Sequence, residues 1–335
     1  MNVKRTSLLG PGTLAILLLL LFAATACRSG GAGEAVVPSD GDPIASLEPA
    51  HLGAGEKLAV VATTNIVGDV IRQVGGDRIE LVTLMGIGVD PHSYVPTPSD
   101  VAAIYDAHVV FLNGGGLEDG LENLLDSAGG AGYRVEISEG IQFLTAQDEA
   151  RAGAAAADDH GALDPHVWFS VPNVIRWVEN ARQALSRLDP GNADVYEANA
   201  QRYTRELEDL DVWIQAQIGT IPAANRKLVT NHASFGYLAE RYGLEQVGAI
   251  YPFNPSADPS ARTIAALQDT VQSYGVQAIF TESTVNTKLA QQMALDTGVR
   301  LVPLYTGSLG GPGSGAETYV GLMRYDVEAI VEALR

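Results

Sequence analysis

Histidines are the residues of this sequence whose type and spacing point to specific chemistry. Only six occur in 335 residues, at positions 51, 92, 108, 160, 166 and 232. His92 and His166 each end an Asp-Pro-His sequence, and His232 ends the run Thr-Asn-His. A neutral imidazole nitrogen is a good ligand for borderline cations such as Zn²⁺. The repeated motif therefore suggests a metal site, in which Asp90 or Asp164 could accept the remaining ring N–H.

Two of these histidines, His92 and His232, fall after predicted strands. Apolar runs typical of buried strands occupy residues 58–64, 79–85, 108–112, 133–137, 227–230, 246–251, 277–281 and 300–305. Helical patterns separate them, and this alternation predicts parallel βαβ units. Ligands bind beyond the carboxyl ends of such strands, where His92 and His232 fall directly. His166 could reach the same place from its loop, and His108, which begins a strand, is interpreted as structural.

A long helical pattern at residues 192–219 separates two halves of the chain. Its apolar residues recur at steps of three and four, and a helix of this length spans roughly 40 Å. We therefore predict an α/β fold with two βα lobes, each containing a parallel four-stranded sheet, joined by one long rigid helix. The metal site would lie in the cleft between the lobes. The N-terminal lobe is predicted at residues 57–191 and the C-terminal lobe at 220–335.

Polar residues just before the helical patterns predict where several helices begin. Asn65, Ser99 and Ser170 are each placed to cap the helix that follows, and Pro172 fits the first turn of the helix after Ser170.

The first residues indicate export and a lipid anchor. Lys4 and Arg5 precede an apolar run of 11 residues at positions 14–24, which is too short to span a membrane. Small residues then precede Cys27, as in a bacterial lipoprotein cleavage box, and with no second cysteine no intrachain disulfide can form. We predict a signal peptide over residues 1–26, a lipid anchor on Cys27, and a flexible Gly-, Ala-, Pro- and Ser-rich tether over residues 27–56.

Composition narrows the range of functions. Hydrophobic residues make up 46% and charged residues 18% of the chain, which is typical of a globular protein. The formal net charge of −19 repels phosphate backbones, so we expect no nucleic-acid partner. Residues 152–160 are of low complexity and end in Asp-Asp-His160, which favours a mobile surface loop.

Several segments resemble the solute-binding lipoproteins of zinc and manganese ABC importers. They occur in the order and at the spacing of that family, at residues 88–94, 163–168, 230–238, 280–283, 304–309 and 318–324. The resemblance implies two βα lobes joined by one long helix, with the ion between them. It assigns metal-ligand roles to His92, His166 and His232.

The resemblance also bears on the identity of the cargo. Manganese-type members usually carry Glu at the place of His232, so this chain is expected to carry Zn²⁺, with Mn²⁺ as the alternative. The family often has an Asp ligand where this chain has Gly307. We therefore predict that water is the fourth donor, with Glu282 as the alternative metal ligand.

The location and partners follow from the same resemblance. It implies an extracytoplasmic protein, anchored to the cell membrane by lipid, that passes its ion to an ABC permease and its ATPase subunit. We expect the binding protein to be a monomer.

Other classes of function stay open when the residues alone are considered. A secreted zinc-dependent hydrolase would use three ligands, an open position and a general base. The chain contains no His-Glu-x-x-His and no Gly-x-Ser-x-Gly motif, so we expect no enzyme. A surface adhesin lipoprotein is a second alternative, for which no residue pattern names a partner. A sugar or siderophore carrier would use aromatic platforms, and only 7% of residues are aromatic.

Overall fold

The structure is a computed structural model that describes residues 43–128, 132–145, 163–252, 259–282 and 284–335. The predicted signal peptide, Cys27 and the loop with His160 lie outside the described residues. Within the described ranges, no helix is both long enough and apolar enough to cross a bilayer.

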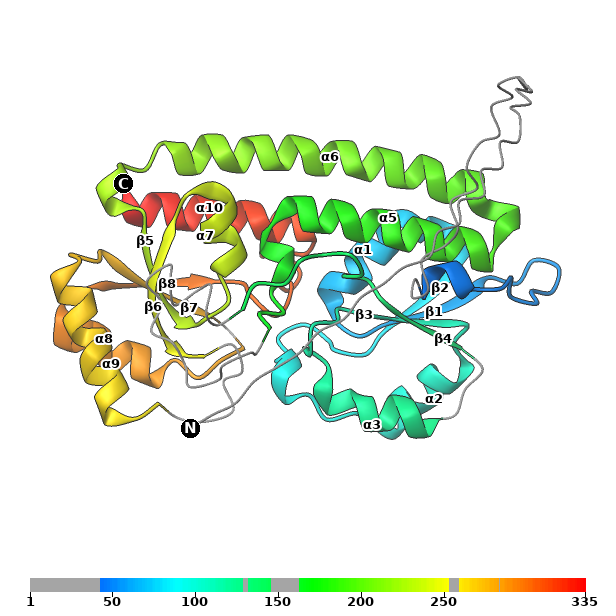
Figure 1. The fold of residues 1–335 in the computed structure, drawn as a ribbon, viewed down its shortest axis with the longest axis horizontal. Helices are drawn as coiled ribbons and strands as arrows, with labels where there is room; N and C mark the ends of the chain where they lie inside the picture. Colours follow the sequence, from blue (N-terminus) through cyan, green and yellow to red (C-terminus); the bar gives the residue numbers. More distant parts are fainter. Residues whose placement is uncertain (1–42, 129–131, 146–162, 253–258, 283) are drawn as a thin grey trace, which may run out of the picture. The chain divides into compact units, whose positions relative to one another are not determined.

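Two parallel sheets of four strands each form the framework, as the sequence predicts (Figure 1). The first sheet has the order β2-β1-β3-β4 and the second the order β6-β5-β7-β8. Their bounds are β1 Leu58–Ala62, β2 Ile79–Thr83, β3 Val109–Leu112, β4 Tyr133–Glu136, β5 Lys227–His232, β6 Glu245–Tyr251, β7 Ala278–Glu282 and β8 Arg300–Leu304. Every predicted strand is present, because each is a short apolar run bounded by turn residues.

Helices cover both faces of these sheets. Their bounds are α1 Asn65–Gly75, α2 Pro98–Asp106, α3 Asp119–Ala128, α5 Val171–Leu188, α6 Ala193–Gly219, α7 Gly236–Tyr242, α8 Ala261–Ser273, α9 Lys288–Thr297 and α10 Tyr319–Leu334. One hydrophobic core includes residues of α1, α5, α6, α7 and α10 together with strands of both sheets. Separate clusters fill the space between β1 and β3 and the helices α2 and α3, and between the second sheet and the helices α8 and α9. Each lobe is therefore a layered βα unit, and one core is common to both lobes.

The long helix α6 joins the first sheet to the second along the chain. It has 27 residues and contacts α5, α1, α10 and α7 (Figure 1). Its predicted stripe is buried in full: Tyr196, Ala200, Tyr203, Leu207, Leu210, Ile214 and Ile218. The predicted fold of two lobes and one long helix is thus confirmed, while the exact divisions at residues 191 and 219 remain proposals.

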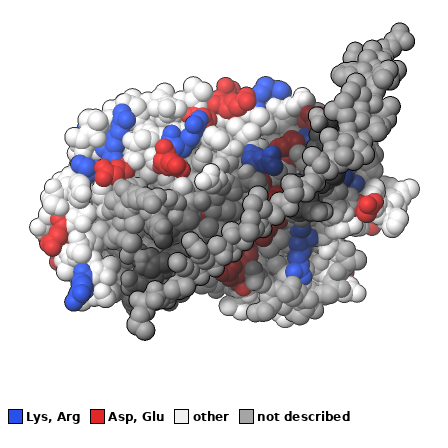
Figure 2. Space-filling model, viewed as in Figure 1, with Lys and Arg blue, Asp and Glu red and all other residues white. Residues whose placement is uncertain are grey.

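Charged side chains are mixed in sign on the face shown in Figure 2, including the part over α6. Interspersed charges of both signs are typical of a soluble surface. This arrangement agrees with a general solubilising role for the acidic residues.

Two predicted helix caps are wrong by one or two residues. The N-cap of α1 is Thr64, whose side chain accepts the backbone N–H of Val67, and Asn65 is instead free to reach other segments. The N-cap of α2 is Thr97, not Ser99, because Asp100 completes a capping box with Thr97. Ser170 occupies the N-cap position of α5 as predicted, but its side chain makes no capping hydrogen bond.

The predicted tether extends too far along the chain. Among residues 43–56, Ile44 is 2% exposed and Leu47 is 4% exposed, and both belong to the main core. The backbone N–H of Ala50 also donates to the carbonyl of Leu188 at the end of α5. A few apolar residues spaced among Gly and Pro carry no periodic signal, so only the packing against α5 identifies this stretch as ordered.

Candidate metal centre

His92 lies in a short turn after β2. The turn spans Pro91–Ser93, and Asp90 caps it: its carboxylate accepts the backbone N–H of His92 at 3.0 Å and the hydroxyl of Ser93 at 2.7 Å. Asp90 therefore holds the backbone of His92 and not its ring. The prediction that Asp90 could accept a ring N–H of His92 is therefore wrong.

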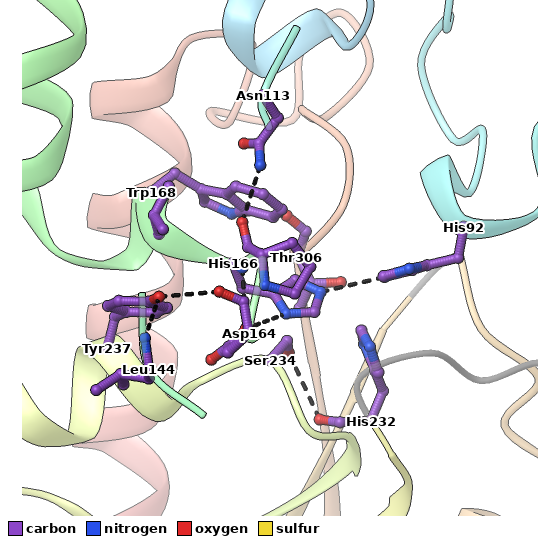
Figure 3. Close-up of polar contacts among 12 residues, drawn as sticks. His92, Asn113, Leu144, Asp164, His166, Trp168, His232, Ser234, Tyr237 and Thr306 are labelled. Atoms are coloured by element: carbon purple, nitrogen blue, oxygen red, sulfur yellow. Dashed lines mark hydrogen bonds and ion pairs between the residues drawn. The ribbon is translucent and has the colours of Figure 1, made fainter. Parts of the chain in front are cut away.

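His166 is buried in the loop before α5, with 1% exposure. The carboxylate of Asp164 accepts the backbone N–H of His166 at 2.9 Å. The same carboxylate also forms a 2.7 Å hydrogen bond with the Nδ1 atom of the His166 ring. Tyr237 of α7 donates its hydroxyl to the carbonyl of Asp164, and Asn113 donates its amide to the carbonyl of Pro165 (Figure 3). Residues from both lobes therefore hold this loop and orient the Nε2 atom of His166.

His232 is the last residue of β5 and is 2% exposed. Its Nδ1 atom lies 3.2 Å from each carboxylate oxygen of Glu282, the last residue of β7. The hydroxyl of Thr306 donates to the same carboxylate. Glu282 thus contacts Nδ1 of His232 and fixes the orientation of the ring. In metal sites, a carboxylate in this position also raises the basicity of the other ring nitrogen, here Nε2.

The three imidazoles converge between the two sheets. Ring centroids lie 5.2 Å apart for His92 and His166, 5.2 Å for His92 and His232, and 4.7 Å for His166 and His232. One nitrogen from each ring lies within 4.8 Å of the other two, and Nε2 of His92 is 3.2 Å from Nε2 of His166. Two nitrogens bound to a tetrahedral Zn²⁺ are about 3.3 Å apart. Within the described residues this is the one group of His, Cys, Asp or Glu with the spacing of a metal site.

Burial keeps the rings of His92 and His166 neutral. It lowers the pKa of His92 to about 2, with the neighbouring His166 and His232 adding to the shift. Burial also lowers the pKa of His166 well below its ordinary value, and His232 adds to this while Glu282 opposes it. A neutral imidazole offers a lone pair, so the site is prepared for a cation without first losing protons.

Two carboxylates lie behind the imidazoles, Asp164 at His166 and Glu282 at His232. Both are buried, at 0% and 3% exposure. Together they can supply two negative charges to oppose the two positive charges of a divalent ion. Buried charge is stable only when paired in this way, so the site suits a dication.

Gly307 lies against the residue that precedes His92. A Cβ atom at position 307 would come within 2.9 Å of Cδ and 3.2 Å of Cγ in the ring of Pro91. A proline ring cannot rotate away, so a side chain at this position would push on the backbone next to a candidate ligand.

Sequence reasoning missed several residues that support the site. Asn113 holds the loop of His166, Thr306 holds Glu282, and the indole of Trp168 donates to the carbonyl of Thr306 at 3.1 Å. Trp168 ends the segment 163–168 that carries the family resemblance, yet its hydrogen-bond partner is 138 residues away. Asn113 directly follows β3, and Thr306 lies two residues after β8. Ligands bind beyond the carboxyl ends of parallel strands, so these positions are the one sequence signal that could have identified both residues.

Two parallel-sheet lobes with three converging imidazoles between them define a solute-binding protein for a divalent metal ion. The family profile described as zinc-uptake complex component A, periplasmic (ZnuA) matches residues 60–333. The chain belongs to this family. It is a family of carriers, so the protein is not an enzyme.

Individual relatives agree on the class and differ in the metal they are named for. The manganese-binding lipoprotein MntA of Halalkalibacterium halodurans is 35% identical over 281 residues, covering 84% of this chain and 89% of MntA. The manganese ABC transporter substrate-binding lipoprotein PsaA of Streptococcus mitis is 29% identical, with 96% and 98% covered. The solved periplasmic zinc-binding protein TroA of Treponema pallidum has a TM-score of 0.75 and 28% identity, with 83% and 99% covered.

Proposed function

We propose that this protein captures one Zn²⁺ ion outside the cytoplasm, on His92, His166 and His232, and delivers it to the permease of an ABC importer. The observation that supports this most is the convergence of three imidazole nitrogens within 4.8 Å of one another. Neutral imidazole is a preferred ligand of zinc, and the carboxylates behind two of the rings complete the usual zinc arrangement.

The donor set favours zinc over manganese. The group of atoms that could hold the ion contains three nitrogens and no carboxylate oxygen. Manganese prefers oxygen ligands, and at a given nitrogen site the order of affinities places Mn²⁺ well below Zn²⁺. MntA and PsaA are named for manganese and TroA for zinc, so the names of relatives support both ions.

Water is the proposed fourth donor. Glu282, the alternative, has both carboxylate oxygens 3.2 Å from Nδ1 of His232 and also receives the hydroxyl of Thr306. To reach the ion, Glu282 would have to give up these contacts. A zinc-bound crystal structure with a Glu282 oxygen at about 2.0–2.2 Å from the metal would overturn the water assignment.

Competition between the two ions tests the proposed cargo. We expect the purified protein, stripped of metal, to bind Zn²⁺ one-to-one and at least about 100-fold more tightly than Mn²⁺, because nitrogen donors favour zinc. Titration with each ion against a chromogenic chelator measures both affinities, and elemental analysis of untreated protein reports the ion acquired in the cell. Equal affinity for Mn²⁺ would contradict the assignment of zinc.

Anchoring and delivery complete the proposal. MntA and PsaA are named as lipoproteins, and PsaA as a component of an ABC transporter. We propose that Cys27 carries the lipid, after removal of the signal peptide, and that the protein acts as a monomer on a permease coupled to its ATPase subunit.

Cys27→Ser should release the protein from the membrane or leave its signal peptide uncleaved, because serine lacks the thiol that accepts the lipid. Cell fractionation and the mass of the mature chain are the measurements. Membrane association and processing equal to those of the wild type would contradict the anchor on Cys27.

A further inference from the structure

His92 differs from the other two proposed ligands in how its ring is oriented. Nδ1 of His166 has Asp164 and Nδ1 of His232 has Glu282 as a carboxylate partner. Over the described part of the chain, the structure shows no carboxylate on the ring of His92, whose ring contacts are the imidazoles of His166 and His232. The direction of this ring must therefore come from the backbone of its own segment.

That segment is docked onto the opposite lobe. The backbone N–H of Gly88 donates to the hydroxyl of Ser308 at 2.8 Å, and Pro91 packs against Gly307. Residues 307 and 308 follow β8 of the second sheet, whereas Gly88 and Pro91 follow β2 of the first. The turn that carries His92 is thus held at both of these points by one short loop.

Ser308 is itself fixed by a residue of α1. The amide of Asn65 donates to the hydroxyl of Ser308 at 3.0 Å and to the carbonyl of Gly86 at 3.0 Å. The amide oxygen of Asn65 accepts the backbone N–H of Leu309 at 2.8 Å. Ser308 is 1% exposed and donates its own proton to the carbonyl of Leu309. One buried hydroxyl therefore connects α1, the turn before His92 and the loop after β8.

We propose that Ser308 is a positioning residue for His92: together with Asn65 it sets the backbone of residues 86–92 and so the direction of the His92 ring toward the ion. This inference rests on the proposed role of His92 as a metal ligand. The ligand without a carboxylate partner on its ring is thus the one whose turn is held by the loop after β8.

Ser308→Ala is the first test. It removes the acceptor for two donors, the N–H of Gly88 and the amide of Asn65. We expect zinc affinity to fall about 10-fold, the lower end of what loss of an outer hydrogen-bond partner costs a metal site. Ser138→Ala is the matched control, because Ser138 is also 1% exposed and accepts the indole N–H of Trp177 at 2.9 Å, away from the histidines. That control should keep the wild-type affinity.

Two further readouts separate positioning from a general loss of structure. The visible absorption of the Co²⁺-loaded protein depends on ligand geometry, and we expect it to change in Ser308→Ala but not in Ser138→Ala. In a His92→Ala background, Ser308→Ala should cause no further loss of affinity, because the residue through which it acts is gone. A full 10-fold loss in that background, or wild-type affinity and spectrum in Ser308→Ala, would overturn the proposal.

Asn65→Asp provides a second variant if Ser308→Ala folds poorly. It keeps an oxygen for the N–H of Leu309, and an acidic residue is favourable in the first turn of α1. It loses the amide donors to Ser308 and Gly86. An added negative charge would attract a cation, so a fall in zinc affinity reports lost positioning, and an unchanged or higher affinity counts against it.

The failure of this inference can be told apart from failure of the proposed function. If His92→Ala itself keeps wild-type zinc affinity, His92 is not a ligand and both proposals fail. If His92→Ala loses zinc while Ser308→Ala and Asn65→Asp bind it as the wild type does, the proposed function stands and the positioning role of Ser308 is wrong.

Discussion

Zinc affinity should fall by more than about 100-fold when His166 is replaced by alanine, since loss of a direct ligand should exceed the loss caused by its outer partners. His166 is 1% exposed, and its Nε2 atom lies 3.2 Å from that of His92. The substitution leaves two imidazoles and also leaves the carboxylate of Asp164 without its 2.7 Å partner. The loss of this ring contact from a buried carboxylate adds to the cost.

Melting curves provide a second measure of the same loss. An ion that binds only the folded protein stabilises it by about 4 kcal/mol at a concentration 1,000 times its dissociation constant. We expect this zinc-dependent stabilisation to be large for the wild type and nearly absent for His166→Ala. His51→Ala is the control, because His51 is exposed and lies far along the chain from the three clustered histidines. Wild-type zinc affinity in His166→Ala would mean that the ion binds elsewhere.

Acid should lower the unfolding free energy of the metal-free protein, and protonation of His92 in the unfolded chain should cause part of this decrease. Its pKa is about 2 in the folded protein against 6.5 for an ordinary histidine. Between these values the unfolded chain holds one more proton, so the free energy of unfolding falls as the pH falls below 6.5. The slope is at most about 1.4 kcal/mol per pH unit, because a single proton is involved, and the solvent that reaches part of the ring makes it smaller.

Comparison with His92→Gln isolates this contribution. Glutamine does not titrate, so the variant should gain stability relative to the wild type by up to about 2 kcal/mol between pH 6.5 and pH 5. Glu118 acts in the opposite direction: burial raises its pKa to about 7, so its stabilising contribution is lost as the pH rises through that value. Because Glu118 is present in both proteins, its contribution cancels in the difference.

Urea unfolding with a chelator present, at several pH values from 7 to 5, measures this difference. A difference in unfolding free energy that stays constant over this range would show that His92 keeps an ordinary pKa. In that case burial does not prepare the ring for the ion.

Local patterns in the sequence determined most of the framework. The eight strands, the stripe of α6 and the three clustered histidines follow from short-range periodicity and from the rule that parallel strands end at one edge. The helix caps were less exact, because by type Asn65 and Ser99 are better caps than Thr64 and Thr97, which the structure uses. Of two adjacent candidates, the residue that caps the helix is decided by the tertiary contacts of its neighbour: Asn65 bonds Ser308 and Gly86, and Thr64 caps α1.

Only the tertiary structure decided how the site is supported. Two Asp-Pro-His motifs look alike in the sequence, yet Asp164 bonds the ring of its histidine and Asp90 bonds the backbone of His92. The hydrogen bond from Asn65 to Ser308 joins residues 243 positions apart. A contact at such separation leaves no periodic trace along the chain, because it exists only once both lobes have folded and their sheet edges meet.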